Sequence, residues 1–110
     1  MSPTVYPVVV IERHATRLYG ELVQKMETRN TCWLRPLALC LAAPPTAATV
    51  LDVRDGPDII CASALVKPVL DTEWLGLLAV MSHAKSACDY AQAHDYVKEF
   101  LAQLFDSDAP

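Results

Sequence analysis

Glycine is scarce in this sequence, and its scarcity removes whole classes of nucleotide-binding site. The chain of 110 residues has only three glycines, and no two of Gly20, Gly56 and Gly76 are close in the sequence. A phosphate-binding loop and a dinucleotide-binding fingerprint both need several glycines within a few residues, because the backbone must turn tightly against the phosphates. The sequence therefore contains neither motif.

Short catalytic and metal-binding motifs are missing as well. The sequence has no Gly-x-Ser-x-Gly and no His-Glu-x-x-His. None of its four cysteines forms a Cys-x-x-Cys pair. They are Cys32, Cys40, Cys61 and Cys88. Free cysteine in an apolar context behaves as a small hydrophobic residue. We therefore expect reduced, structural thiols, no metal site and no cofactor.

Long apolar runs are also absent. The best stretch, from Trp74 to Met81, contains Gly76 and is far shorter than the roughly eighteen residues of a membrane span. The first residues lack the basic region and apolar core of a secretory signal. We therefore expect a soluble, cytoplasmic protein without direct membrane insertion.

The chain is nevertheless rich in apolar residues. Hydrophobic residues make up 53% of it and charged residues 20%, with a formal net charge of −4. This length and composition predict a single domain over residues 1–110, with more apolar residues than a core of this size requires. The negative charge disfavours nucleic acid as a partner, because phosphates attract a basic surface.

The first half of the chain reads as β-strands. Apolar or alternating stretches bounded by turn residues predict five strands, over residues 5–12, 18–27, 32–41, 49–54 and 59–62. Asp55-Gly56-Pro57-Asp58 predicts a hairpin between the last two strands. Gly20 inside the second strand indicates a bulge or a sharp bend.

The third strand contains a conflict of side-chain parity. Trp33 and Arg35 share a parity with three leucines at positions 37, 39 and 41. An unpaired arginine should not be buried, whereas the leucines should be. A bulge at Pro36 would add one residue and reverse the parity. Trp33 and Arg35 then point outward, near Tyr19 or Val23 across the hairpin. The alternative is a core Trp33, with Arg35 extending to the rim.

The second half of the chain reads as two helices. Asp71 can cap the first, which is apolar on most sides and should be buried. The second, running to about Phe105, has a one-sided apolar stripe. Strands over about 5–62 and helices over about 71–105 predict an α+β domain. We expect a small curved antiparallel sheet or partly open barrel of about five strands, followed by two C-terminal helices.

Three segments carry a resemblance to a known group of proteins. They are Arg17-Leu18-Tyr19-Gly20-Glu21-Leu22, Cys32-Trp33-Leu34-Arg35-Pro36-Leu37-Ala38-Leu39 and Leu70-Asp71-Thr72-Glu73. These segments resemble small soluble cyanobacterial proteins of unknown function. The resemblance implies an accessory protein of a photosynthetic cell and carries over no catalytic residue.

Motif poverty and surplus apolar residues favour a non-enzymatic protein–protein interaction module, such as an adaptor, assembly factor or regulator of a larger complex. Its partner would be another protein or a second copy of the chain. The candidate partner-binding residues, which include the types most enriched in binding hot spots, are Trp33, Arg35, Tyr19, Arg13 and His14.

Two alternatives remain open from the sequence. One is a small enzyme or ligand-binding protein that uses His14, Arg13 or a cysteine. The other is a nucleic-acid-binding barrel, supported by arginines and aromatic residues that alternate in the first third of the chain.

Overall fold

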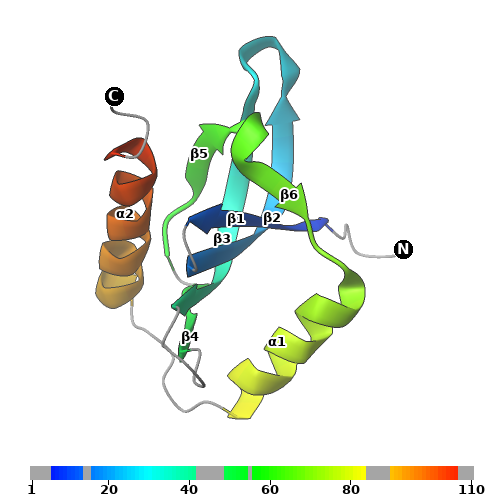
Figure 1. Cartoon of the computed structure of the whole chain (residues 1–110), viewed down its shortest axis with the longest axis vertical. Coiled ribbons are helices and arrows are strands. Elements are labelled where there is room, and N and C mark those ends of the chain that lie inside the picture. Colours follow the sequence, from blue (N-terminus) through cyan, green and yellow to red (C-terminus); the bar gives the residue numbers. More distant parts are fainter. Residues whose placement is uncertain (1–5, 14–15, 42–48, 55, 84–89, 107–110) are drawn as a thin grey trace.

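Six antiparallel strands and two C-terminal helices make up the described part of the chain, and Figure 1 shows how they are arranged. The computed structural model describes residues 6–13, 16–41, 49–54, 56–83 and 90–106. The elements in chain order are β1 (Val8–Arg13), β2 (Thr16–Met26), η1 (Glu27–Arg29), β3 (Thr31–Leu41), β4 (Thr49–Asp52), β5 (Ile59–Ala62), η2 (Ser63–Leu65), β6 (Val66–Pro68), α1 (Asp71–His83) and α2 (Tyr90–Asp106). The prediction of an α+β fold with a small antiparallel sheet before two helices is confirmed.

The long strand β3 organises the sheet, whose order is β4-β3-β2-β1-β6. Along its edge away from β2, β3 pairs first with β5 and then with β4. The predicted hairpin between β4 and β5 is therefore wrong. The chain does not reverse after β4, because Val53 N–H donates to the carbonyl of Leu37 at 3.2 Å and so continues along β3.

The sheet curls because one short link joins its two sides. β5 lies beside β3, whereas β6 pairs with β1, with Val9 opposite Pro68. Only the three residues of η2 connect them, and three residues span at most about 10 Å. A flat sheet would separate β5 and β6 by three strands, so the sheet must bend. The described strands thus form a small curved antiparallel sheet, the first of the two predicted forms, and this sheet is not closed.

Two β-bulges set which side chains point to which face. Tyr19 pairs with Ala38 and Gly20 with Pro36, so Leu37 is the extra residue on β3. Leu34 and Leu39 therefore lie in the same buried cluster although their parities differ. The predicted parity reversal near Pro36 is confirmed. A second register shift makes Val23 the extra residue on β2.

Gly20 is required where β2 crosses this bulge. A Cβ at Gly20 would lie 3.0 Å from the carbonyl oxygen of Arg35. A backbone oxygen cannot move aside as the end of a long side chain can, so only glycine allows the two strands to approach this closely.

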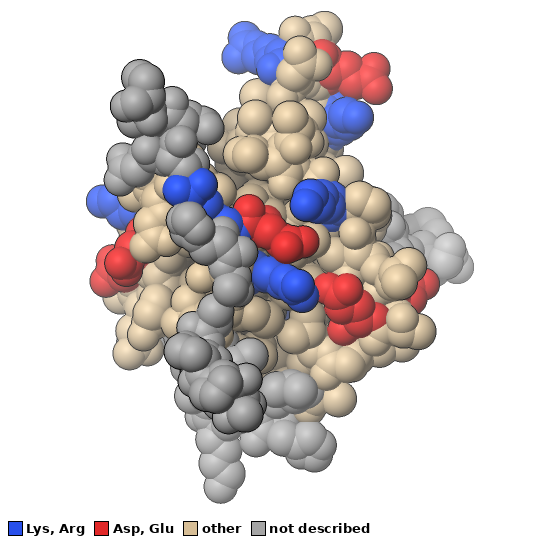
Figure 2. Space-filling model, in the orientation of Figure 1, with Lys and Arg blue, Asp and Glu red and all other residues tan. Residues whose placement is uncertain are grey.

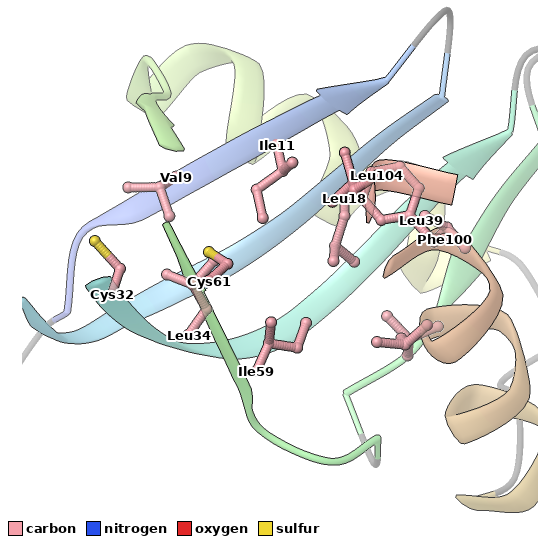
Figure 3. Packing of buried hydrophobic residues seen from close by; sticks show 12 residues of the cluster. Val9, Ile11, Leu18, Cys32, Leu34, Leu39, Ile59, Cys61, Phe100 and Leu104 are labelled. Atoms are coloured by element: carbon pink, nitrogen blue, oxygen red, sulfur yellow. The ribbon is translucent and has the colours of Figure 1, made fainter. Parts of the chain in front are cut away.

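The larger buried cluster lies between the sheet, β5 and α2. Figure 3 shows Leu34, Ile59 and Cys61 directed toward one another, with Phe100 and Leu104 approaching from α2. The fully buried members are Val9, Ile11, Leu18, Cys32, Leu34, Leu39, Val53, Ile59, Cys61, Val97, Phe100 and Leu104. This cluster forms the main core of the described residues.

A smaller cluster lies on the opposite face, beneath α1. Its buried members are Val10, Tyr19, Ala38 and Met81, with Trp74 and Leu77 of α1 packed against them. The other side of α1 is uncovered, and Leu75 is 61% exposed. The prediction that this apolar helix is buried is therefore wrong, because α1 has the sheet on one side only. Neither α1 nor α2, as far as the structure describes them, is long and apolar enough to cross a membrane.

Candidate functional site

The outward face of β3 near the β2–β3 turn is the main candidate site. Cys32 and Leu34 point into the core, so Trp33 and Arg35, which alternate with them along β3, point to the opposite face. Trp33 lies opposite Gln24 on β2 and opposite Ile60 on β5. This part of the face lies beyond the cluster that α1 covers, which extends along β3 only through Ala38 and Cys40.

Asp58 links the two residues that the sequence singles out on this face. The indole Nε1 of Trp33 donates to Asp58 Oδ2 at 3.0 Å, and Arg35 Nε lies 3.9 Å from Asp58 Oδ1. The side chains of Arg35 and Asp58 are 47% and 42% exposed. An exposed ion pair of this kind contributes little to stability, because water and salt screen it. The contacts of Asp58 matter here for position, because they keep the Trp33 indole and the Arg35 guanidinium side by side.

We call Trp33, Arg35, Asp58 and Ile60 the Trp33 surface. Trp33 is half-buried and Arg35 exposed, and Ile60 is 57% exposed. The indole is thus neither a core residue nor fully in water. It has an apolar neighbour that the chain leaves uncovered and a cation within the same small area.

Tyr19 does not belong to this surface, contrary to the prediction. It is only 2% exposed and lies beneath α1, with its ring centroid 6.5 Å from that of Trp74. Its hydroxyl donates to Glu73 Oε2 at 2.5 Å. Burial, followed by this hydrogen bond, raises the pKa of Tyr19 to about 12. Tyr19 therefore attaches α1 to the sheet and stays protonated at neutral pH.

Arg13 is not brought to the Trp33 surface either. His14 lies outside the described residues. Arg13 ends β1, opposite Thr16, at the end of the sheet away from the β2–β3 turn. Its Nε is buried and has no hydrogen-bond partner among the residues that the structure describes. Of the four predicted site residues that the structure describes, it therefore brings two together, Trp33 and Arg35.

The described cysteines are free and lie in apolar surroundings. Cys32 and Cys61 are buried and Cys40 is half-buried, while Cys88 lies outside the described residues. Burial raises the pKa of the Cys40 thiol and, together with the neighbouring Cys32, that of Cys61 to about 11. Thiols protonated at neutral pH are poor nucleophiles. In the described part of the chain, no group of three His, Cys, Asp or Glu side chains is arranged to hold a metal ion.

A cavity of about 360 Å³ opens between β1, β6 and the start of β3. Most of its lining is apolar, including Val9, Leu22 and Val66, and its polar groups include Lys25 and Ser63. Ser63 Oγ lies 3.3 Å from Cys32 Sγ, where either atom can donate. No motif or spacing in the sequence predicts this cavity.

Charges of both signs are mixed on the described surface. Arg17 pairs with Glu12 at 3.7 Å and Arg35 with Asp58. On the side shown in Figure 2, Lys and Arg lie among Asp and Glu, and neither sign dominates. Comparison with known proteins adds no further direction, because no family model, curated protein or solved structure matches the chain.

Proposed function

We propose that this chain is a non-enzymatic protein–protein interaction module, an adaptor, assembly factor or regulator of a larger complex, that binds through the Trp33 surface. The supporting observation is that Trp33, Arg35 and Ile60 lie together on a part of the sheet that neither helix covers. Tryptophan and arginine are the residue types most enriched in binding hot spots, since they combine contact area with a polar group.

The chemistry of this surface describes its partner. Ile60 and the exposed part of the Trp33 indole would fit an apolar recess on the partner. Arg35 calls for a carboxylate, since its present partner Asp58 lies 3.9 Å away and is itself exposed. A protein surface that offers both fits better than a nucleic acid, because the formal net charge of the chain is −4 and phosphates repel such a surface. We assign the protein to the cytoplasm as part of the same proposal. Its place in a photosynthetic cell, implied by the resemblance above, also stays a prediction.

Variants of the full chain test this proposal. A partner identified by affinity capture is purified, and its affinity for each variant is measured by calorimetry. Trp33→Ala should weaken binding by about tenfold or more, as for a hot-spot residue. Tyr96→Ala on α2 is the matched control, because Tyr96 is also an exposed aromatic residue at 39%. It should leave the affinity unchanged.

The melting temperature of each variant decides how a loss of binding is interpreted. A loss of several degrees in Trp33→Ala alone would place the indole in the core and refute the proposed site. Ile60→Ser removes an exposed side chain, and Arg35→Ala an exposed cation, so both should fold normally and bind less tightly. A partner that binds all three variants as tightly as the parent chain would contradict the proposal.

The cavity near Cys32 supports a second candidate, a ligand-binding protein. A mostly apolar cavity of about 360 Å³ with Lys25, Ser63 and Asp71 among its lining residues suits a small apolar molecule with one polar group, such as a carboxylate that Lys25 can pair with. Thermal shift measurements with medium-chain carboxylic acids test this candidate. A rise in melting temperature that Lys25→Ala removes would support it, and no rise with any acid would count against it.

A further inference from the structure

The side of α1 that faces away from the sheet is apolar and uncovered. Trp74, Leu77 and Met81 pack toward the sheet. The opposite side, which we call the outer stripe of α1, consists of the exposed residues Thr72, Leu75, Gly76 and Ala79. Leu70, just before the helix, is 75% exposed. A helix that is apolar on most sides is normally buried on those sides, and none of the residues that the structure describes covers this one.

Gly76 points independently to a close contact on this stripe. A Cβ added at Gly76 would meet nothing within 4 Å, so no contact with the described residues requires glycine there. Glycine is less favourable than alanine inside a helix, because it has more conformational freedom to lose. Its usual advantage is to let another backbone approach closely. At Gly20 that backbone is β3 of the same chain, whereas at Gly76 none of the described residues supplies it.

Charge and side-chain size indicate what covers the stripe. The acidic residues of α1, Asp71 and Glu73, both lie in its first turn, and along α1 Figure 2 shows mainly uncharged residues. Two parallel copies of α1 would place these acidic turns together, which is unfavourable. Two antiparallel copies place the two acidic turns at opposite ends of the helix pair and so keep them apart.

The stripe is also complementary to itself in this arrangement. α1 runs from Asp71 to His83, so a two-fold axis at its midpoint, Leu77, places Leu75 opposite Ala79 of a second copy. A large side chain then meets a small one on both sides of the axis, and Gly76 lies where the helices are closest. We propose that a second copy of this chain covers the outer stripe of α1, giving a two-fold dimer with antiparallel α1 helices.

Sedimentation velocity and light scattering of the full chain test the dimer over a roughly hundredfold range of concentration, because its population follows mass action. The parent chain should shift from monomer to dimer. Leu75→Glu should remain monomeric throughout. Ile60→Glu is the matched control, since Ile60 is equally exposed at 57% but lies on the Trp33 surface, and it should dimerise as the parent does.

Gly76→Ala separates an interface role from a structural role. The added methyl group has room within one chain, so the melting temperature of the dilute monomer should be unchanged or higher. The same group should keep the two helices apart and weaken dimerisation by about tenfold or more. Dimerisation unaffected by Gly76→Ala would overturn the close approach, and a disulfide between two Thr72→Cys chains would overturn the antiparallel arrangement.

Other occupants give different results. A parent chain that is monomeric at every concentration overturns the proposal. If that monomer also sediments with vesicles of phosphatidylcholine and phosphatidylglycerol, and Leu75→Glu does not, the stripe binds a membrane surface instead. Because Trp33→Ala should not change the oligomeric state, failure of the dimer leaves the proposed role of the Trp33 surface separately testable.

Discussion

The two helices cover opposite faces of one sheet, and they differ in what they leave outside. α2 places Val97, Phe100 and Leu104 in the core and presents Lys98, Glu99 and other polar side chains to water. α1 packs on the sheet through Trp74, Leu77 and Met81 and leaves Leu75 and Ala79 exposed. The chain by itself accounts for the sequence of α2. The sequence of α1 contains apolar residues, such as Leu75, that the described part of the chain leaves exposed.

The largest expected effect is on the α2 side. Phe100 is 3% exposed within the larger cluster, so Phe100→Ala should lower the free energy of unfolding by about 3–5 kcal/mol. Leu77→Ala on α1 removes a half-buried side chain and should cost less than half as much. Urea denaturation of both variants measures the difference. Equal losses of unfolding free energy would mean that the two helices contribute alike to stability, which would contradict the contrast drawn between them.

A smaller effect is expected where β2 crosses the bulge of β3. Gly20→Ala places a methyl group 3.0 Å from a backbone oxygen and should cost roughly 1–3 kcal/mol. Gly76→Ala, with open space around it, is the internal control and should cost nothing. Thermal unfolding of the two variants at low concentration compares them. An undisturbed Gly20→Ala variant would show that the bulge can relax.

The smallest effect concerns the attachment of α1 to the sheet. Tyr19→Phe removes the hydrogen bond to Glu73 and should cost about 1 kcal/mol at neutral pH. The folded pKa of about 12 lies above the unfolded value of 10.0, so the native state keeps a proton that the unfolded state loses. The stability due to Tyr19 is therefore fully present below pH 10 and decreases as the pH rises toward 12.

Unfolding experiments across this pH range compare the parent chain with Tyr19→Phe. The difference in stability between them should shrink as the pH rises, because the variant lacks the titrating group. A constant difference would show that Tyr19 ionises as freely in the folded protein as in the unfolded chain.

The sequence predicted the structure best where the alternation of side chains along a strand was informative. The conflict between Arg35 and the leucines located the bulge, and the register places the extra residue at Leu37. β6 was missed because it has three residues and contains Pro68, which favours a loop in any reading of sequence alone. The turn signal around Gly56 was misread, because a turn motif does not say which strand pairs next.

The candidate site was only half accessible to sequence reasoning. Parity offered an outward-facing Trp33 and Arg35 as one of two interpretations, beside a core Trp33, and in the structure both residues lie on the outer face. Asp58, which bonds to Trp33, could not be identified, because it lies far along the chain and becomes a neighbour only through the β3–β5 register. Tyr19 was misplaced for the same reason, since nothing in its own strand shows that α1 lies above it.

The pairing of β1 with β6 has a consequence for the order of folding. β2 and β3 are joined by a tight turn, with Asn30 in the left-handed conformation at φ 52°, and can pair early because the loop to be closed is short. Val9 of the first strand must instead pair with Pro68 of the last strand, which is far away in the sequence. We therefore expect this contact to form last and to open first in the native protein, with amide hydrogens of β6 exchanging faster than those of β2.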